Sequence, residues 1–153
     1  MSRLVHGACV AFGARGVLLR GPSGSGKSDL AFRLIGLGAV LVADDQVALA
    51  AEDGRLVASA PERLFGLLEL RGLGLASMPV AARAGLALVV DLVPRDAVPR
   101  LPEPRHATLE GLDLPLLALH AFDLTAAVKV RLALETIAVH GFPGDDGRLG
   151  GPA

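Results

Sequence analysis

The stretch GPSGSGKSDLAFRLIG, residues 21–36, decides the fold of this chain. It fits the pattern G-x-x-x-x-G-K-[S/T] without a gap, with Gly21, Gly26, Lys27 and Ser28 at the fixed positions. Lysine occurs at only two positions in the chain, whereas thirteen residues are arginine. A compact ammonium on a flexible stem suits contact with phosphates better than a rigid guanidinium fork does. The stretch therefore predicts a phosphate-binding loop that leads into a helix.

The chemistry expected of this loop follows from its residue types. Glycines let successive backbone N–H groups turn inward around an anion, and the positive end of the following helix points to the same place. We expect Lys27 to contact the β- and γ-phosphates of ATP and Ser28 to offer its hydroxyl to Mg²⁺. The required context is present, because an apolar strand precedes the loop and an amphipathic helix follows it. The predicted nucleotide-binding residues are Gly21, Pro22, Ser23, Gly24, Ser25, Gly26, Lys27 and Ser28.

Two adjacent acids, Asp44 and Asp45, end the apolar stretch AVLVADD of residues 39–45. Neighbouring residues of a strand face opposite ways, so at most one acid points at the phosphates unless the strand ends there. Two carboxylates placed together can divide the work, one binding Mg²⁺ and the other accepting a hydroxyl proton. The alternative metal-binding acid is Asp91, which follows the apolar run LALVV.

The pattern of apolar runs and turn residues predicts a mixed α/β fold with one domain over residues 1–141 and a disordered tail over 142–153. The hairpins argue against a regular doubly wound sheet. The stretch 64–80 remains open between a strand and a helix end followed by a glycine-rich loop. The expected elements are strands at 5–12, 16–21, 39–45 and 85–94, hairpins at 46–59 and 108–120, an extended connection at 94–104, and helices at 27–36 and 124–141.

Composition narrows the class of protein. The 153 residues carry a net charge of −1, and the chain has no tryptophan or tyrosine, so nothing marks a nucleic-acid or membrane surface. The apolar runs are too short to span a bilayer, and no targeting segment is recognised. A single cysteine, Cys9, fits a reducing compartment. We therefore expect a cytoplasmic protein.

These motifs together resemble the HPr kinase/phosphorylase family. The stretch from His6 to Asp45 contains that family's histidine–glycine pair, loop and double aspartate in the same order and spacing, and LELRGLGL at residues 68–75 is similar to its second signature. The resemblance covers roughly residues 4 to 135. It implies a P-loop kinase core of the type shared with phosphoenolpyruvate carboxykinases, with a mixed sheet, the loop helix and late helices.

The resemblance also implies a function. The chain would be an ATP- and Mg²⁺-dependent kinase that phosphorylates a serine of HPr, the phosphocarrier protein of the sugar phosphotransferase system, in a regulatory role and as a homohexamer. Asp45 would accept the proton with Asp44 as its partner, and His6 matches the family's active-site histidine. The implied catalytic residues are His6, Lys27, Asp44, Asp45, Arg71 and Arg100, and the implied metal-binding residues are Ser28 and Glu69.

The chain departs from long family members in two respects. Long members carry an N-terminal domain before the histidine. They also carry a proline-glycine-arginine-asparagine stretch tied to dephosphorylation, and the corresponding region of this chain reads FDLTAAVKVRLALE at residues 122–135 instead. It therefore resembles the short, kinase-domain form of alphaproteobacteria, and we expect a poor phosphorylase. Two alternatives remain open: a small-molecule or carboxykinase-like kinase using Arg71, Arg100 and Arg131, and a nucleotide-binding regulator.

Overall fold

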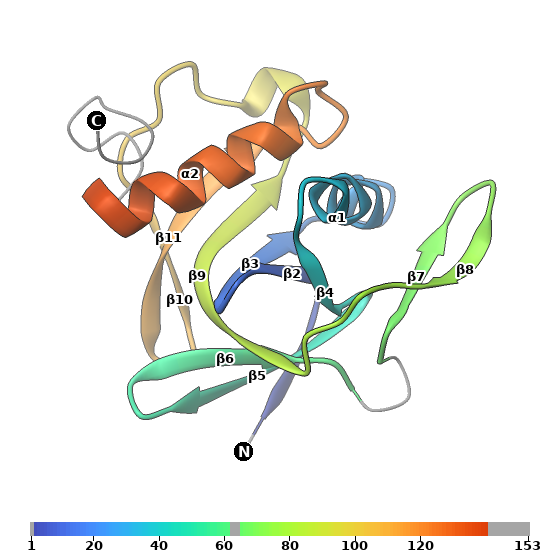
Figure 1. The fold of residues 1–153 in the computed structure, drawn as a ribbon. Coiled ribbons are helices and arrows are strands. Elements are labelled where there is room, and N and C mark those ends of the chain that lie inside the picture. The colour runs from blue at the N-terminus through green and yellow to red at the C-terminus, as the bar shows by residue number, and fades with distance from the viewer. Residues whose placement is uncertain (1, 62–64, 141–153) are drawn as a thin grey trace.

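A curled, nine-stranded mixed β-sheet organises the fold, and helices α1 and α2 pack against its outer face (Figure 1). The computed structural model describes residues 2–61 and 65–140, so the predicted tail lies outside the described residues. The mixed α/β class is confirmed, although the described part after α1 has one α-helix and one 3₁₀ turn where several late helices were expected. The elements are β1 Arg3–His6, β2 Ala8–Phe12, β3 Arg15–Arg20, α1 Lys27–Gly36, β4 Val40–Ala43, β5 Gln46–Glu52, β6 Arg55–Ser59, β7 Leu67–Leu70, β8 Gly74–Ser77, β9 Arg83–Leu92, η2 Arg95–Ala97, β10 His106–Leu109, β11 Leu112–Leu119 and α2 Ala126–His140.

Strand β9 is the centre of the sheet. It pairs in parallel with β3 and β11 and antiparallel with β6. Gly16 pairs with Leu86 but Val17 pairs with Leu88, so Ala87 is an extra residue that forms a bulge. A bulge bends its strand, and Figure 1 shows β9 sweeping in a curve from β6 towards α2. Because β3 and β11 both run parallel to β9, the carboxyl ends of these three strands meet at one edge of the sheet.

The sheet is buried on both faces, which explains its nearly continuous apolar strands. In β2, Ala8 and Val10 face the core beneath the helices, whereas Cys9 and Ala11 face the core inside the curl. The same alternation continues in β3, where Leu18 lies inside the curl. Two cores therefore share one sheet. No described helix is long and apolar enough to cross a membrane.

A corner at Gly7 divides the strand that the sequence predicted over residues 5–12. Strand β1 pairs with β5, and β2 pairs with β3 and β4. The Gly7 N–H donates to the Asp45 carbonyl oxygen at 3.1 Å. A Cβ atom at position 7 would lie 2.7 Å from the carbonyl oxygen of Leu19. Only glycine therefore allows the two strand pairs to meet here without a shift.

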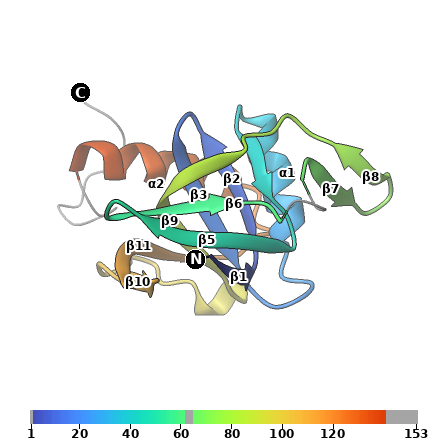
Figure 2. The same ribbon diagram turned by 90° about the horizontal axis from the view of Figure 1, so that it is seen from below.

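Three hairpins complete the fold. Those predicted at 46–59 and 108–120 are confirmed as β5–β6 and β10–β11, and positive φ angles of 52° and 77° at Asp53 and Gly54 fit the tight turn of the first. The stretch left open at 64–80 forms β7–β8, a separate hairpin that stands away from the main sheet beyond α1 (Figure 2). Leu68 and Leu70 anchor it to the core.

Cys9 provides a test of the packing inside the curl. Its side chain is fully buried, and burial raises the pKa of the thiol to about 12. Because the thiolate is the reactive form, we expect the native protein to resist a thiol reagent at mildly alkaline pH and to react completely once unfolded in denaturant. Absorbance of the released chromophore measures this, and rapid labelling of the native protein would contradict the packing.

Candidate functional site

A cleft of about 600 Å³ lies at the carboxyl edge of the sheet, between the loop of residues 21–26, the start of α1, the corner at Gly7 and the β7–β8 hairpin. It brings together residues from five separate parts of the sequence. The predicted site residues that line it are His6, Ser23, Gly24, Gly26, Lys27, Ser28, Asp44, Asp45, Glu69 and Arg71.

The loop that forms the floor of the cleft depends on its glycines. Gly26 is the N-cap of α1 and has a φ of +97°, in the left-handed region that favours glycine. A Cβ atom there would lie 2.7 Å from the Cβ atom of Ala121. A Cβ atom at Gly21 would lie 2.5 Å from the hydroxyl of Ser25. Conformation and close packing therefore both disfavour a side chain at Gly26, and close packing disfavours one at Gly21.

Lys27 and Ser25 show that the loop suits an anionic ligand. The Lys27 ammonium, on a side chain that is almost fully buried, donates to the carbonyl oxygens of Gly21 at 2.7 Å and Pro22 at 3.0 Å, so it is held over the loop. The Ser25 hydroxyl is buried with no hydrogen-bond partner among the described residues. Phosphate oxygens bound in the loop are acceptors of the kind that such donors need.

Asp44 and Ser28 form the part of the cleft that fits a divalent cation. The Ser28 hydroxyl donates to Asp44 Oδ1 at 2.8 Å. Burial raises the pKa of the Asp44 carboxyl, and hydrogen bonds from the Ser28 hydroxyl and from the backbone of Asp45 and Glu69 oppose that rise. A half-buried carboxylate is stabilised by a cation, and carboxylate and hydroxyl oxygens are ligands that Mg²⁺ accepts.

Asp45 occupies a different environment. Strand β4 ends at Ala43, and Asp45 has a φ of +68°, so the chain turns and both acids line the cleft. The sequence had left this question open. The side chain of Asp45 is 70% exposed, and its Oδ1 lies 3.6 Å from Nδ1 of His6. One acid is therefore turned towards Ser28 and the other towards solvent and a histidine.

The β7–β8 hairpin adds Glu69 and Arg71 to the cleft. In β7, Leu68 and Leu70 are buried while Glu69 points to the exposed side. The described residues contain no cluster of three or more His, Cys, Asp or Glu side chains that would hold a metal. The Ser28 hydroxyl and the Asp44 carboxylate are the oxygen groups that lie within hydrogen-bond distance of each other here, and the metal-binding role of Glu69 stays a prediction.

Three charged residues singled out from the sequence, Asp91, Arg100 and Arg131, do not line the cleft. Arg100 is exposed in the connection between η2 and β10, and its catalytic role stays a prediction. Asp91 accepts two hydrogen bonds from Arg20, at 2.7 and 3.1 Å, which gives this acid a partner on the neighbouring strand. The arrangement favours Asp44 over Asp91 as the metal-binding acid.

The sequence reasoning missed the turn of residues 120–123, between β11 and α2, and the aromatic side chains near it. Phe122 and Phe32 both line the cleft. The only signal in the sequence was the small number of aromatic residues, since the chain has five phenylalanines and no tryptophan or tyrosine. Nothing in the local pattern told which of them would reach the loop.

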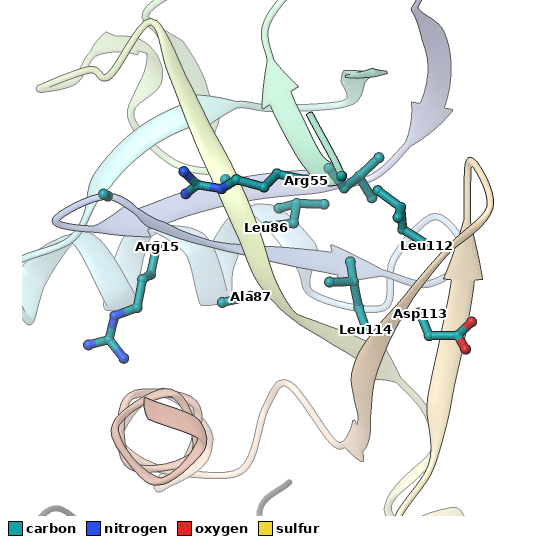
Figure 3. A pocket seen from close by; sticks show the side chains of 11 residues that line it. Arg15, Arg55, Leu86, Ala87, Leu112, Asp113 and Leu114 are labelled. Atoms are coloured by element: carbon teal, nitrogen blue, oxygen red, sulfur yellow. The ribbon is translucent and has the colours of Figure 1, made fainter. Parts of the chain in front are cut away.

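A second cavity, of about 260 Å³, lies at the opposite end of β3 and β9. Figure 3 shows Arg15 pointing away from it towards α2 and Asp113 pointing away on the other side. The Arg15 guanidinium donates to the Leu134 carbonyl oxygen at 2.9 Å. The charged groups of this cavity do not converge, and its walls are largely aliphatic, so the loop cleft remains the candidate site.

Comparisons with known proteins identify the family to which the chain is similar. The family model described as the HPr serine kinase C-terminal domain matches residues 1–97. An HPr kinase/phosphorylase from Geobacillus sp. (strain WCH70) is 47% identical over 96 residues, which cover 58% of this chain and 31% of that protein. Its counterpart from Clostridium tetani is 42% identical over 88 residues, covering 58% of this chain and 28% of that protein. The chain thus spans about a third of the length of these curated relatives.

A solved structure extends the comparison to the whole fold. The Hpr(Ser) kinase/phosphatase from Coxiella burnetii matches with a TM-score of 0.74 and 26% sequence identity, over 84% of this chain and 94% of that one. The structural match therefore reaches beyond the part that the family model covers.

Gly26 allows a direct test of the loop geometry. We expect Gly26→Ala to lower the free energy of unfolding by about 1–3 kcal/mol, because alanine is strained at this φ and meets Ala121. Nucleotide affinity should fall with it. Gly36→Ala, at the other end of α1 and with open space around its Cβ, is the matched control and should change stability by less than about 1 kcal/mol. Equal stability of both variants in denaturant titrations would contradict the loop geometry.

Proposed function

The chain belongs to the HPr serine kinase C-terminal domain family, and we propose that it transfers the γ-phosphoryl group of ATP to a serine of the phosphocarrier protein HPr. The observation that carries the proposal is one cleft in which a phosphate-binding loop faces two carboxylates in unlike environments. Phosphoryl transfer needs such a division, because one group must manage the charge of the phosphates and another the proton of the acceptor.

The loop and the first turn of α1 bind the donor. Backbone N–H groups around Gly24 and Gly26 surround the β- and γ-phosphates, and the Lys27 ammonium leaves its carbonyl partners to neutralise their charge. Ser28 and Asp44 would hold Mg²⁺, which would offset the negative charge of the phosphate oxygens and so lower their repulsion of a nucleophile. The cation would offset the unfavourable burial of the charged Asp44 carboxylate.

Asp45 handles the acceptor. As the serine Oγ forms its bond to the γ-phosphorus and the bond to the ADP oxygen breaks, the exposed carboxylate of Asp45 accepts the hydroxyl proton. His6, 3.6 Å away, orients that carboxylate. An open cleft with a solvent-exposed base suits a side chain carried on the surface of a protein. We further propose that the enzyme works as a homo-oligomer and catalyses the reverse phosphorolysis poorly.

The alternative of a kinase for a small anionic molecule is less well supported. It would need several cationic side chains to converge on the acceptor. Of the arginines considered for that role, Arg71 lines the cleft, whereas Arg100 and Arg131 do not. A nucleotide-binding regulator without chemistry remains distinguishable, because it would bind ATP but label no acceptor.

Incubation with γ-labelled ATP and Mg²⁺, with and without HPr, tests the function. We expect label on an HPr serine from the native enzyme, none after EDTA, and recovery when Mg²⁺ is restored. Lys27→Ala should lose ~10²–10³ or more in rate because its ammonium stabilises charge on the transferred group. A retained cooperative melting transition is the control for folding, since the buried ammonium also bonds to the loop carbonyls. Unlabelled HPr in the presence of a bound nucleotide would refute the kinase proposal.

Substitution of the two acids should have unlike effects. Asp45→Asn removes the proton acceptor but leaves the phosphate site, so we expect phosphoryl transfer to be lost and the affinity for a fluorescent ATP analogue to be kept. Asp44→Asn should instead weaken the response to Mg²⁺ and be partly rescued at high metal concentration. His6→Ala should slow transfer less than Asp45→Asn does. A near-native rate for Asp45→Asn beside an inactive Asp44→Asn would show that the roles are reversed.

A further inference from the structure

We propose that Phe122 is the stacking platform for the base of the bound nucleotide. The inference deepens the proposed function and rests on it for the ligand being a nucleotide. Phe122 belongs to the turn of residues 120–123, which lies beyond residue 97, where the match to the family model ends.

The ring lies next to the phosphate-binding loop. A Cβ atom at Gly26 would be 3.0 Å from Cζ and 3.2 Å from Cε1 of Phe122, so the ring packs against the residue that starts α1. At the same time 55% of Phe122 is exposed, and it lines the cleft that holds Lys27 and Ser28. An aromatic ring with one side on the loop and the rest open to the cleft is placed to cover a flat ligand.

The turn is held in place from several elements. The Arg33 guanidinium on α1 donates to the carbonyl oxygens of both Ala121 and Asp123. Arg95 of η2 donates to the Asp123 carboxylate at 2.7 Å. The His120 ring lies at hydrogen-bond distance, 3.0 Å, from the Val93 carbonyl oxygen, and meets Phe122 edge to face with the ring centroids 5.7 Å apart.

These ties mean that little conformational freedom is lost when a ligand meets the ring. Holding an apolar ring half exposed is unfavourable in water, and burying its open face against a base recovers hydrophobic free energy. The turn therefore has the rigidity of a binding surface rather than that of a loose connection.

The topology leads the nucleotide to this ring. The phosphate-binding loop follows β3, and the turn of residues 120–123 follows β11, two strands away across β9 at the same carboxyl edge. In sheets with parallel strands, ligands bind outside that edge and extend from one loop to another. Figure 1 shows the turn before α2 beside α1. A triphosphate bound at Lys27 would thus extend its nucleoside towards Phe122 or away from the protein.

Other described aromatic residues are less suitable. Phe12 and Phe65 do not line the cleft, and Phe32 lies on α1 itself, one turn beyond Ser28. A phenyl face carries no hydrogen-bond donor or acceptor, so stacking favours the presence of a base without choosing among bases. Phe122 is accordingly expected to strengthen the binding of ATP and GTP alike.

Calorimetric titration with the Mg²⁺ complexes of ATP, GTP and inorganic tripolyphosphate tests the proposal. Phe122→Leu keeps an apolar side chain but removes the aromatic face, and we expect it to weaken ATP and GTP about 10-fold while tripolyphosphate binds as to the native chain. Leu124→Ala is the matched control, because this neighbour is 97% exposed and does not line the cleft, and it should leave all three affinities unchanged.

Phe122→Trp supplies a second readout. The chain has no tryptophan, so the new indole is its sole fluorophore of that kind, and we expect ATP to quench it while tripolyphosphate does not. Undiminished ATP binding by Phe122→Leu would overturn the proposal. So would an equal loss for ATP and tripolyphosphate, since that pattern means that the turn supports the loop and does not contact the base.

The outcome is separable from that of the kinase assay, because no titration contains HPr. A selective loss of ATP affinity in Phe122→Leu supports the stacking platform whatever the kinase assay shows. Failure of the native enzyme to label HPr would refute only the proposed acceptor. Efficient labelling of HPr by a Phe122→Leu enzyme with native ATP affinity would refute the platform and leave the kinase.

Discussion

The hydrogen bond from the Gly7 N–H to the Asp45 carbonyl oxygen joins the two halves of the curled sheet at the place where the chemistry is proposed. On one side of it β2 pairs with β4, and on the other β1 pairs with β5. Asp45 supplies the acceptor of this bond, and His6 directly precedes the donor residue. The bond therefore holds His6 and Asp45 next to each other. The absence of a Cβ atom at position 7 lets the Leu19 carbonyl approach, so the corner also lies directly beside the strand that leads into the loop.

The corner gives two neighbouring carboxylates opposite environments. Asp44, the first residue after β4, reaches Ser28, and burial raises the pKa of its carboxyl. Asp45 takes a left-handed conformation that few residue types other than glycine, asparagine and aspartate accept readily, and turns outward. The backbone therefore separates the acid proposed to bind the metal from the acid proposed to accept the proton within one peptide unit, a division that suits phosphoryl transfer.

The sequence predicted the parts of this site whose cause is local. The loop pattern and the helix at 27–36 follow from residue types a few positions apart, and the structure has that helix over the same residues. The split of residues 5–12 at Gly7 was not predictable, because its cause is the carbonyl of Leu19 from another strand. The orientation of Asp45 depends on one φ angle, which alternation along a strand does not give. The position of Phe122 depends on Arg33, 89 residues earlier in the chain, which bonds to the backbone on either side of it. No local pattern encodes such a contact.

Gly26 connects these long-range contacts to the loop. Its left-handed backbone directs the N–H groups at the start of α1, and its missing side chain makes room for Ala121 and Phe122. The loop glycine of the motif thus serves the proposed phosphate site on one side and the packing of a distant turn on the other. Since Arg33 ties that turn back to the same helix, α1 carries both the lysine of the loop motif and the contacts that place the aromatic ring beside it. In the proposed mechanism a single helix then positions the groups at both ends of the nucleotide, and the corner at Gly7 positions Asp45, the proposed proton acceptor.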